Sequence, residues 1–432
     1  MISTPDEIIE KPEFKVYENS FSVEYTLEQP CNNPCETNLL LQQDITDITN
    51  KQFINPSVDF SREPSEFLRE IELSNHVGYA FINKPKEEHF HYDFEPMLKL
   101  MLYQRLSRVR YLSILEERLK QNADKCATNL GFKRRYTPDR RTIGMFYFDY
   151  IEKDGHQQFF GSLVKRCKDI CSKLGIPFGK RIGVDSTPLE TLPNDGIGEY
   201  NAHYIQTKHL GKMVKVHVAS CLDTGIPLAF IVSGANECDE KYLIPLLEKL
   251  KALGIDVEEV YGDGHYDIHE NWAKINILHK AKCYFNLRDD SIYNPNGCYE
   301  EIKRQYQKFH TCNDFVVSNE LSLEFMARYL IERGIYDCVG SYHRNQWFNL
   351  KMTEPFKYIE IYSKRNHCEN LFSILKEQLG FENNLVGNAW KGWDKLNIYT
   401  SQFLIGLVVV ALIRLENGIS DGLMKISEGV FH

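Results

Sequence analysis

The strongest constraint on the fold is the order of apolar patterns between residues 181 and 287. Short apolar runs that alternate or continue predict strands, whereas apolar residues repeating every three or four positions predict helices. The patterns predict strands at 181–184, 214–218, 228–232, 257–261 and 281–287, with helices at 243–253 and 270–280. This order indicates an α/β fold.

The length of 432 residues exceeds one ordinary compact domain and predicts two or three domains. A composition of 43% hydrophobic and 26% charged residues, with a mean hydropathy of −0.40, excludes collagen-like, coiled-coil and wholly disordered chains. The longest apolar run, at 403–413, is shorter than the ~20 residues that span a bilayer, so we expect a buried helix and no membrane. We also expect no secretory signal, because no basic segment precedes an apolar run near residue 1.

Twelve cysteines are spread along the chain without a regular disulfide framework, which favours a reducing, cytoplasmic compartment. Two pairs, Cys31 with Cys35 and Cys167 with Cys171, could each supply half of a zinc site. Neither pair has a clear second pair at zinc-finger spacing, so we do not expect structural zinc.

The net charge of −9 hides a strong asymmetry along the chain. Residues 1–98 contain 19 acidic and 7 basic residues, whereas residues 99–141 contain 12 basic and 4 acidic residues. The basic residues of 99–141, here called the basic block, are interleaved with helical apolar patterns that begin near Phe94. We expect a new helix to begin at Thr137-Pro138. The basic block predicts either a DNA-binding helical region that neutralises phosphates or the solvated face of a helical bundle. Charge alone leaves both interpretations open.

Three carboxylates occupy positions that suit a metal site. Asp185 ends the first predicted strand, Asp263 follows the fourth, and Glu369 lies on a late helix predicted at 362–379. Hard divalent cations such as Mg²⁺ prefer a few carboxylate oxygens together with water and substrate phosphate. The pattern therefore predicts that the three side chains meet at one edge of the sheet.

The late helix has a second regularity. At 100° per residue, four polar residues fall within an arc of about 60°, opposite an apolar face: Tyr362, Arg365, Glu369 and Lys376. The alternative is a solvated face on which Arg365 and Glu369 form an ordinary i,i+4 pair worth a few tenths of a kcal/mol. Taken alone, the pattern favours that alternative.

Three segments together resemble the DDE transposases of the IS4 type, which are insertion-sequence transposases with an RNase H-like catalytic core. Residues 183–187 (GVDST) are similar to the first-acid segment of that family, and residues 261–267 (YGDGHYD) are similar to the second. The four polar residues of the late helix match every spacing of its Tyr-x2-Arg-x3-Glu-x6-Lys signature. The resemblance covers residues 90–415, including the helical stretch ahead of the sheet.

The resemblance implies an RNase H-like core, a mixed five-stranded sheet flanked by helices, with an N-terminal helical domain and an insertion before the last catalytic helix. The expected divisions are an acidic lead-in at 1–75, a basic helical DNA-binding domain at 76–165, an RNase H-like catalytic domain at 166–416 and a tail at 417–432. Because 105 residues separate Asp263 from Glu369, we expect an inserted subdomain at 288–333.

The resemblance also implies a DNA transposase that cleaves the ends of an insertion sequence and transfers them into target DNA. Asp185, Asp263 and Glu369 would bind two Mg²⁺ or Mn²⁺ ions. The expected DNA-binding residues are Tyr362, Arg365 and Lys376 on the late helix and Arg134, Arg135, Arg140 and Arg141 in the basic block. The expected partners are double-stranded DNA with terminal inverted repeats, target DNA and a second copy of the chain, at the nucleoid in a prokaryotic cytoplasm.

Three alternatives stay open: an RNase H-like nuclease that cuts without joining, an inactive DNA-binding remnant, and a hydrolase of a small phosphorylated substrate. The hydrolase has no use for the basic block, and the presence of all three acids weighs against the remnant. His203, His209 and His265 could contact DNA or metal, and Trp272 and Trp347 could stack on a flipped base. Ordinary surface or core positions are the favoured interpretation for all five.

Overall fold

The computed structural model describes most of the chain between residues 63 and 424. The described residues are 63–73, 91–121, 125–133, 136–151, 153–191, 196–208, 211–287, 292–309, 322–381 and 392–424. All of them belong to one compact unit of the chain. Most of the predicted lead-in at 1–75, with Cys31 and Cys35, therefore lies outside the described residues.

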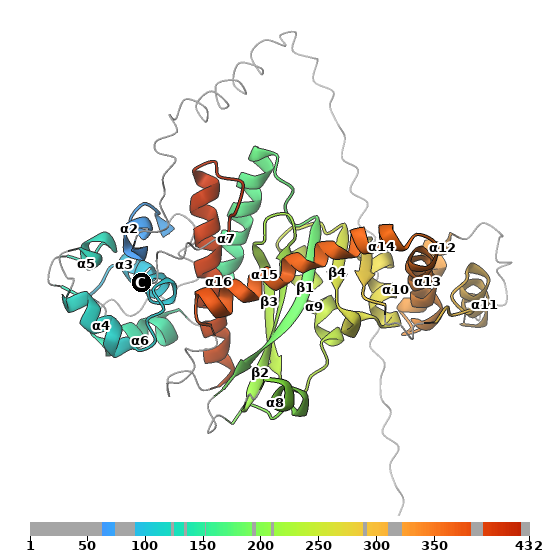
Figure 1. Cartoon of the computed structure of the whole chain (residues 1–432), viewed down its shortest axis with the longest axis horizontal. Coiled ribbons are helices and arrows are strands. Elements are labelled where there is room, and N and C mark those ends of the chain that lie inside the picture. Colours follow the sequence, from blue (N-terminus) through green and yellow to red (C-terminus); the bar gives the residue numbers. More distant parts are fainter. Residues whose placement is uncertain are drawn as a thin grey trace, which may run out of the picture. The chain divides into compact units, whose positions relative to one another are not determined.

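A mixed five-stranded sheet forms the centre of the described fold (Figure 1). Its strands are β1 (Arg181–Glu190), β2 (Met213–Cys221), β3 (Pro227–Gly234), β4 (Glu259–Gly262) and β5 (Lys282–Phe285), in the spatial order β3-β2-β1-β4-β5. β1 pairs antiparallel with β2 and parallel with β4, and β5 pairs parallel with β4. This confirms the predicted α/β fold, which is consistent with an RNase H-like core.

The first strand is longer than the sequence predicted, so Asp185 lies inside β1 rather than at its end. Pro188 favours a strand end because proline has no N–H to donate. In the structure β1 pairs with β4 only from Arg181 to Gly183, whereas it pairs with β2 along its whole length. Beyond Gly183 one side of β1 is therefore a sheet edge, and proline is tolerated there.

Helices cover both faces of the sheet. On one face, α7 (Lys153–Leu174) and α16 (Trp393–Glu416) pack side by side and against β3 (Figure 1). On the other face, α9 (Glu240–Ala252) packs against β2 and β3. Within the described part of the chain, α16 is the one helix long and apolar enough to cross a membrane, and 94% of its most apolar window is buried inside the protein. A helix that is apolar all round and buried is a core helix, as predicted for 403–413.

The region ahead of the sheet is helical, as predicted. Its elements are α2 (Pro64–Leu68), α3 (Phe94–Leu106), α4 (Leu112–Gln121), α5 (Cys126–Asn129), α6 (Arg140–Met145) and the π-helical η3 (Phe146–Tyr150). α3 packs against α16, and the buried residues of these helices join the same hydrophobic core as the sheet. The domain boundary expected at 165/166 falls inside α7, which is one continuous helix.

The last helix of this region begins two residues later than expected. Asp139, rather than Thr137, caps α6, because its carboxylate accepts a hydrogen bond of 2.7 Å from the N–H of Thr142. Arg140 and Arg141 therefore lie in the first turn of α6, where both side chains are exposed.

Between β4 and the late helix, the described residues form β5 and several helices. The helices are η4 (Gly264–Tyr266), α10 (His269–Ile277), α11 (Tyr299–Phe309), α12 (Leu323–Ile331) and α13 (Asp337–Thr353). A second hydrophobic core forms where Ile302 and Leu330 meet Ile277 and Val339. This second core packs the region predicted as an insertion, 288–333, against α10 and α13. The sequence patterns did not predict α11 and α13, whose exposed faces are rich in polar residues.

The late helix begins earlier than predicted and is not a uniform α-helix. α14 (Pro355–Tyr362) runs through the 3₁₀ turn η5 (Ser363–Arg365) into α15 (Asn366–Ser373) and the π-helical η6 (Ile374–Gln378). The prediction of one regular helix at 362–379 was wrong in this respect. A π turn replaces i→i+4 bonds with i→i+5 bonds, so it shifts the angular position of Lys376 relative to Glu369.

The basic block is not one continuous surface, because Arg105 on α3 is buried with only 1% of its area exposed. Its Nε and Nη2 donate to Oε1 of Gln402 over 2.9 and 2.7 Å. The guanidinium also lies 5.2 Å from the ring centroids of both Tyr399 and Phe403. Arg105 therefore joins α3 to α16 inside the core, where no phosphate can reach it.

We expect Arg105→Ala to lower the free energy of unfolding by about 2–5 kcal/mol, because it leaves a cavity and an unpaired Gln402 amide. Arg105→Met, which keeps most of the volume, should cost less. The matched control is Arg140→Ala, which should change stability by no more than about 0.5 kcal/mol because the side chain is exposed. Denaturant unfolding of the three variants tests this, and equal losses for Arg105→Ala and Arg140→Ala would contradict it.

Candidate active site

The parallel pairing of β1 with β4 brings two of the predicted acids to the same level of the sheet. In the register of this pair, Gly183 lies opposite Tyr261. Asp185 and Asp263 each come two residues later, so both lie just beyond the point where the pairing ends. Two carboxylates that are 78 positions apart in the sequence thus become neighbours through strand register alone.

Asp185 is largely buried, with 17% of its side chain exposed. Its Oδ1 accepts a hydrogen bond of 2.8 Å from the N–H of Ser186. Burial, with repulsion from Asp263 and Asp239, raises the pKa of Asp185 from its ordinary value of 3.8 to about 6, although Arg365 and the Ser186 N–H oppose the shift. Excess negative charge at this point is the electrostatic condition that favours a bound cation.

Asp263 is more accessible and caps the turn that follows β4. Its Oδ1 accepts from the N–H of His265 over 2.9 Å, and its Oδ2 lies 3.0 Å from Nδ1 of the same residue. The side chain of His265 is 67% exposed, so it can leave the carboxylate without disturbing the core. His265 therefore lies at the edge of the site rather than on an unrelated surface.

Glu369, the third predicted acid, is linked to Asp185 by an arginine that binds both carboxylates. Arg365, with 15% of its side chain exposed, lies between Asp185 and Glu369. Its Nη2 is 3.3 Å from Oδ2 of Asp185, and its Nη1 is 3.3 Å from Oε1 of Glu369. The Arg365–Glu369 pair expected for an ordinary helix face is present, but the guanidinium also binds β1. The face is therefore part of the site.

The helix that bears Glu369 lies very close to β1. A Cβ atom added at Gly183 would fall 1.8 Å from Sγ of Cys368, so this approach requires glycine. Tyr362 contributes a second link, because its hydroxyl donates to the carbonyl of Gly262 over 3.4 Å. Burial raises the pKa of Tyr362 to about 12, which keeps that hydroxyl protonated. The end of α14 is thereby fixed beside the end of β4.

The C-terminal end of the late helix is held by the helical region ahead of the sheet. The guanidinium of Arg108 donates to the main-chain carbonyls of Glu377 and Gln378. Lys376, the last residue of the four-residue pattern, is half-buried on η6 just before them. The helical region thus contacts the helix on which Glu369 and Lys376 lie.

Two of the three expected ligands are neighbouring carboxylates, which is the donor type that a divalent cation prefers. Mg²⁺ commonly binds one or two carboxylates, with water and phosphate oxygens completing the shell, and Asp185 and Asp263 provide such a pair. Within the described ranges, however, no three His, Cys, Asp or Glu side chains lie close enough together to hold a metal ion. Glu369 is linked to Asp185 through Arg365. The predicted convergence of all three carboxylates is therefore incomplete in this structure.

The other candidate residues fall elsewhere. Arg134, Arg135 and His209 lie outside the described residues. His203 is exposed on α8 (Ala202–Lys208). Trp272 and Trp347 are buried, and their indole N–H groups donate to Oδ1 of Asp267 and to the carbonyl of Phe285, so both belong to the core. Cys167 and Cys171 are buried on α7, and burial raises the pKa of both thiols.

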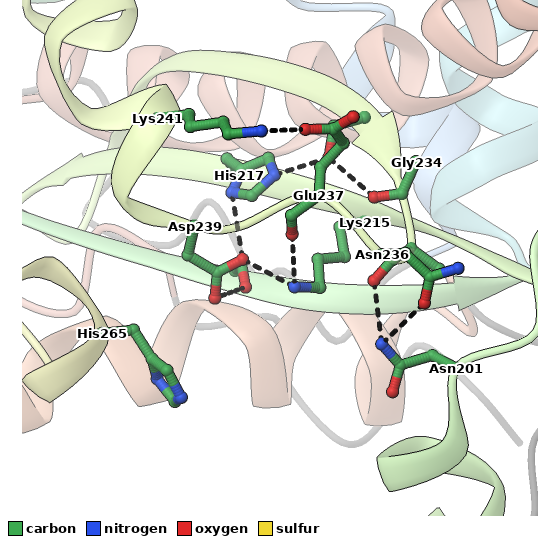
Figure 2. Close-up of polar contacts among 12 residues, drawn as sticks. Asn201, Lys215, His217, Gly234, Asn236, Glu237, Asp239, Lys241 and His265 are labelled. Carbon is green, nitrogen blue, oxygen red and sulfur yellow. Dashed lines mark hydrogen bonds and ion pairs between the residues drawn. The ribbon is translucent and has the colours of Figure 1, made fainter.

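A polar cluster that no sequence pattern predicted lies on the face of β1 opposite Asp185. Asp239, at the start of α9, forms an ion pair with Lys215, and Figure 2 shows both side chains beside the buried imidazole of His217. The alternation of Lys215 and His217 with valines on β2 signals a half-buried strand, and no sequence pattern indicates that α9 would cover these polar side chains.

A mixed sheet with one carboxylate on β1, a second just beyond the neighbouring β4 and a third on a helix packed against β1 is consistent with an RNase H-like DDE domain. Residues 177–388 match the family model described as a transposase DDE domain. This match supports a DDE transposase, and it spans Asp185, Asp263 and Glu369. A comparison with curated proteins finds no match.

The raised pKa of Asp185 gives the metal-free protein a specific pH dependence. The contribution of this group to stability is fully present below pH 4 and is lost as the pH rises through about 6, because the folded state then holds an ionised, buried carboxylate. We expect the stability of the wild type relative to Asp185→Asn to fall by up to about 2 kcal/mol between pH 4.5 and pH 7 in EDTA. Denaturant unfolding at each pH measures this, and a constant difference would contradict the expectation.

Proposed function

We propose that the chain is an IS4-type transposase, which cleaves DNA at the ends of an insertion sequence and joins those ends to target DNA. The observation that supports this best is the β1–β4 register, which sets Asp185 beside Asp263 inside a transposase DDE domain. The Tyr-x2-Arg-x3-Glu-x6-Lys spacing of the late helix supports the IS4 type.

The metal site of this proposal consists of Asp185 and Asp263, joined by Glu369 once Arg365 has left it. Together they would hold two Mg²⁺ or Mn²⁺ ions, since the donors are carboxylate oxygens only. Bound divalent cations supply Lewis-acid activation of the attacking oxygen and neutralise charge on the leaving oxygen. The contribution of the protein would be to hold the carboxylates at a fixed separation.

Arg365 has two possible partners in this scheme. Without DNA its guanidinium compensates Asp185 and Glu369, while its buried Nε has no hydrogen-bond partner in the described part of the chain. A DNA phosphate offers two oxygens in the geometry that a guanidinium fits best. We propose that Arg365 turns from the carboxylates to a phosphate when the DNA end binds, and that Tyr362 and Lys376 contact the same strand.

Binding of the transposon end is assigned to the basic block, through the exposed Arg140 and Arg141 and through Arg134 and Arg135. These residues would neutralise phosphates and make the affinity dependent on salt. Joining two ends in one reaction favours a homodimer on DNA that has terminal inverted repeats. The proposed place of action is the nucleoid of a prokaryotic cell.

We expect Asp185→Asn, Asp263→Asn and Glu369→Gln each to abolish cleavage while leaving the affinity for end DNA nearly unchanged. Each change keeps the size of the side chain and removes a metal-binding charge. Single-turnover cleavage of a pre-bound inverted-repeat end, with binding measured separately, tests this. Normal cleavage by any of the three variants would contradict the assignment.

A strand-transfer assay distinguishes transposition from nuclease activity alone. Wild-type protein supplied with Mg²⁺, pre-cleaved ends and a target plasmid should produce joined molecules as well as cut ones. Cutting without joining would favour the nuclease alternative, and binding without either reaction would favour an inactive remnant.

We expect Arg365→Gln to strengthen metal binding but to weaken DNA cleavage. In the absence of DNA, Arg365→Gln should strengthen Mn²⁺ binding by about tenfold, because it removes a cation that competes for Asp185 and Glu369. The same change should slow cleavage of bound DNA, because a phosphate contact is lost. Lys364→Ala is the matched control, since it removes a neighbouring charge on η5. Weaker Mn²⁺ binding by Arg365→Gln would show that Arg365 does not occupy the metal site.

A further inference from the structure

A buried ion pair lies on the face of the sheet opposite Glu369. Nζ of Lys215 on β2 is 2.9 Å from Oδ1 of Asp239 at the start of α9. The two side chains are only 10% and 11% exposed. Lys215 also donates to the main-chain carbonyl of Glu237 over 2.9 Å, which fixes its position (Figure 2).

The ion pair is connected to the proposed metal site through Ser186. The hydroxyl of Ser186 donates to Oδ2 of Asp239 over 3.0 Å, and its N–H donates to Oδ1 of Asp185 over 2.8 Å. Successive residues of a strand point to opposite faces, so Ser186 faces α9 while Asp185 faces the helix of Glu369. Asp239 thus holds the side chain of the residue whose main-chain N–H binds the carboxylate of Asp185.

The surroundings of Asp239 indicate that it does not itself bind a cation in this arrangement. Its Oδ1 is engaged by Lys215 and its Oδ2 by Ser186. The buried His217 has its Nε2 2.8 Å from the hydroxyl of Ser233 and stacks on Tyr242 with a centroid distance of 4.3 Å. Burial lowers the pKa of His217 to about 4, so at neutral pH Lys215 is the cation that balances Asp239.

Stability alone is a weak reason for such a pair. The cost of removing two charges from water often equals or exceeds their attraction, so an apolar pair of similar volume is often as stable. A buried pair does, however, hold its hydrogen-bond partners in one geometry. Here that partner is the residue next to Asp185, which makes positioning the function that best accounts for the pair.

We propose that Asp239, held by Lys215, is a positioning residue for the metal site: through Ser186 it fixes the carboxylate of Asp185 in the orientation that binds a divalent cation. This inference rests on the proposed function, since it concerns the metal affinity of Asp185. Outer groups that orient metal ligands typically contribute 10–100-fold to metal affinity or activity.

The experiment compares Ser186→Ala, Asp239→Asn and the double variant with the wild type. We measure Mn²⁺ affinity of the full chain by calorimetry, the Mn²⁺ dependence of single-turnover cleavage, and the thermal midpoint. Each single variant should weaken Mn²⁺ affinity about 10–100-fold. The double variant should be no weaker than Asp239→Asn, because both changes break the same link. At saturating Mn²⁺ the cleavage rate should recover most of its wild-type value, which a loss of folding would not allow.

The chain offers a matched control close by. Glu237 and Lys241 form an exposed ion pair of 2.9 Å at the same end of α9 (Figure 2). Glu237→Gln should leave Mn²⁺ affinity unchanged, because the main-chain carbonyl that accepts from Lys215 remains. If Asp239→Asn does not fold, Ser186→Ala decides the matter, since it removes one hydroxyl group and keeps the buried pair.

The possible outcomes distinguish a failure of this inference from a failure of the proposed function on which it rests. If Asp185→Asn loses Mn²⁺ binding while Ser186→Ala and Asp239→Asn bind like the wild type, the positioning role is wrong and the proposed metal site stands. If the wild type binds no Mn²⁺ and cleaves no DNA, the proposed function fails and the inference fails with it.

Discussion

The parallel pairing of β1 with β4 is the constraint on which the described site depends. It sets Gly183 opposite Tyr261, and thus brings Asp185 level with Asp263 at the point where the two strands part. A shift of one residue would turn one of the carboxylates to the other face of the sheet. The close contact between Gly183 and Cys368 adds a second requirement, because the helix that bears Glu369 can approach β1 only over a glycine. Register and close approach together set the positions of the three acids.

Bringing carboxylates close together at a partly buried site is electrostatically unfavourable, and burial and repulsion raise the pKa of Asp185. In this structure Arg365 offsets the cost by binding Asp185 and Glu369 at once. The same guanidinium is suited to a phosphate, so the group that compensates the acids in the absence of DNA is also the one that we propose to bind DNA. On the opposite face, Lys215 compensates Asp239 in a buried pair. Arg365 thus balances Asp185 and Glu369 on one face of the sheet, and Lys215 balances Asp239 on the other.

Much of the fold could be predicted from the sequence, because short apolar runs and apolar residues at helical spacing indicate which side chains are buried. The sheet strands, the core helix at 403–413 and the helical region ahead of the sheet all follow from such patterns. The length of β1 could not be predicted, since Pro188 is tolerated only because β4 leaves one side of β1 unpaired. The irregular late helix was missed for a similar reason: nothing in its spacing reveals the 3₁₀ and π turns. At the site, the sequence predicted roles for Asp185, Asp263, Glu369 and Arg365, and these roles stay predictions. It did not identify Asp239, whose contact with Ser186 depends on how α9 packs against the sheet.

The central claim is that strand register brings Asp185 and Asp263 together as ligands of one divalent cation. Anomalous diffraction from crystals of the protein bound to a transposon end and Mn²⁺ tests it most directly. The account predicts an anomalous peak within about 2.2 Å of a carboxylate oxygen from both Asp185 and Asp263, with the guanidinium of Arg365 on a phosphate. A peak that contacts neither aspartate, or Arg365 still bridging Asp185 and Glu369 in the presence of metal and DNA, would contradict it.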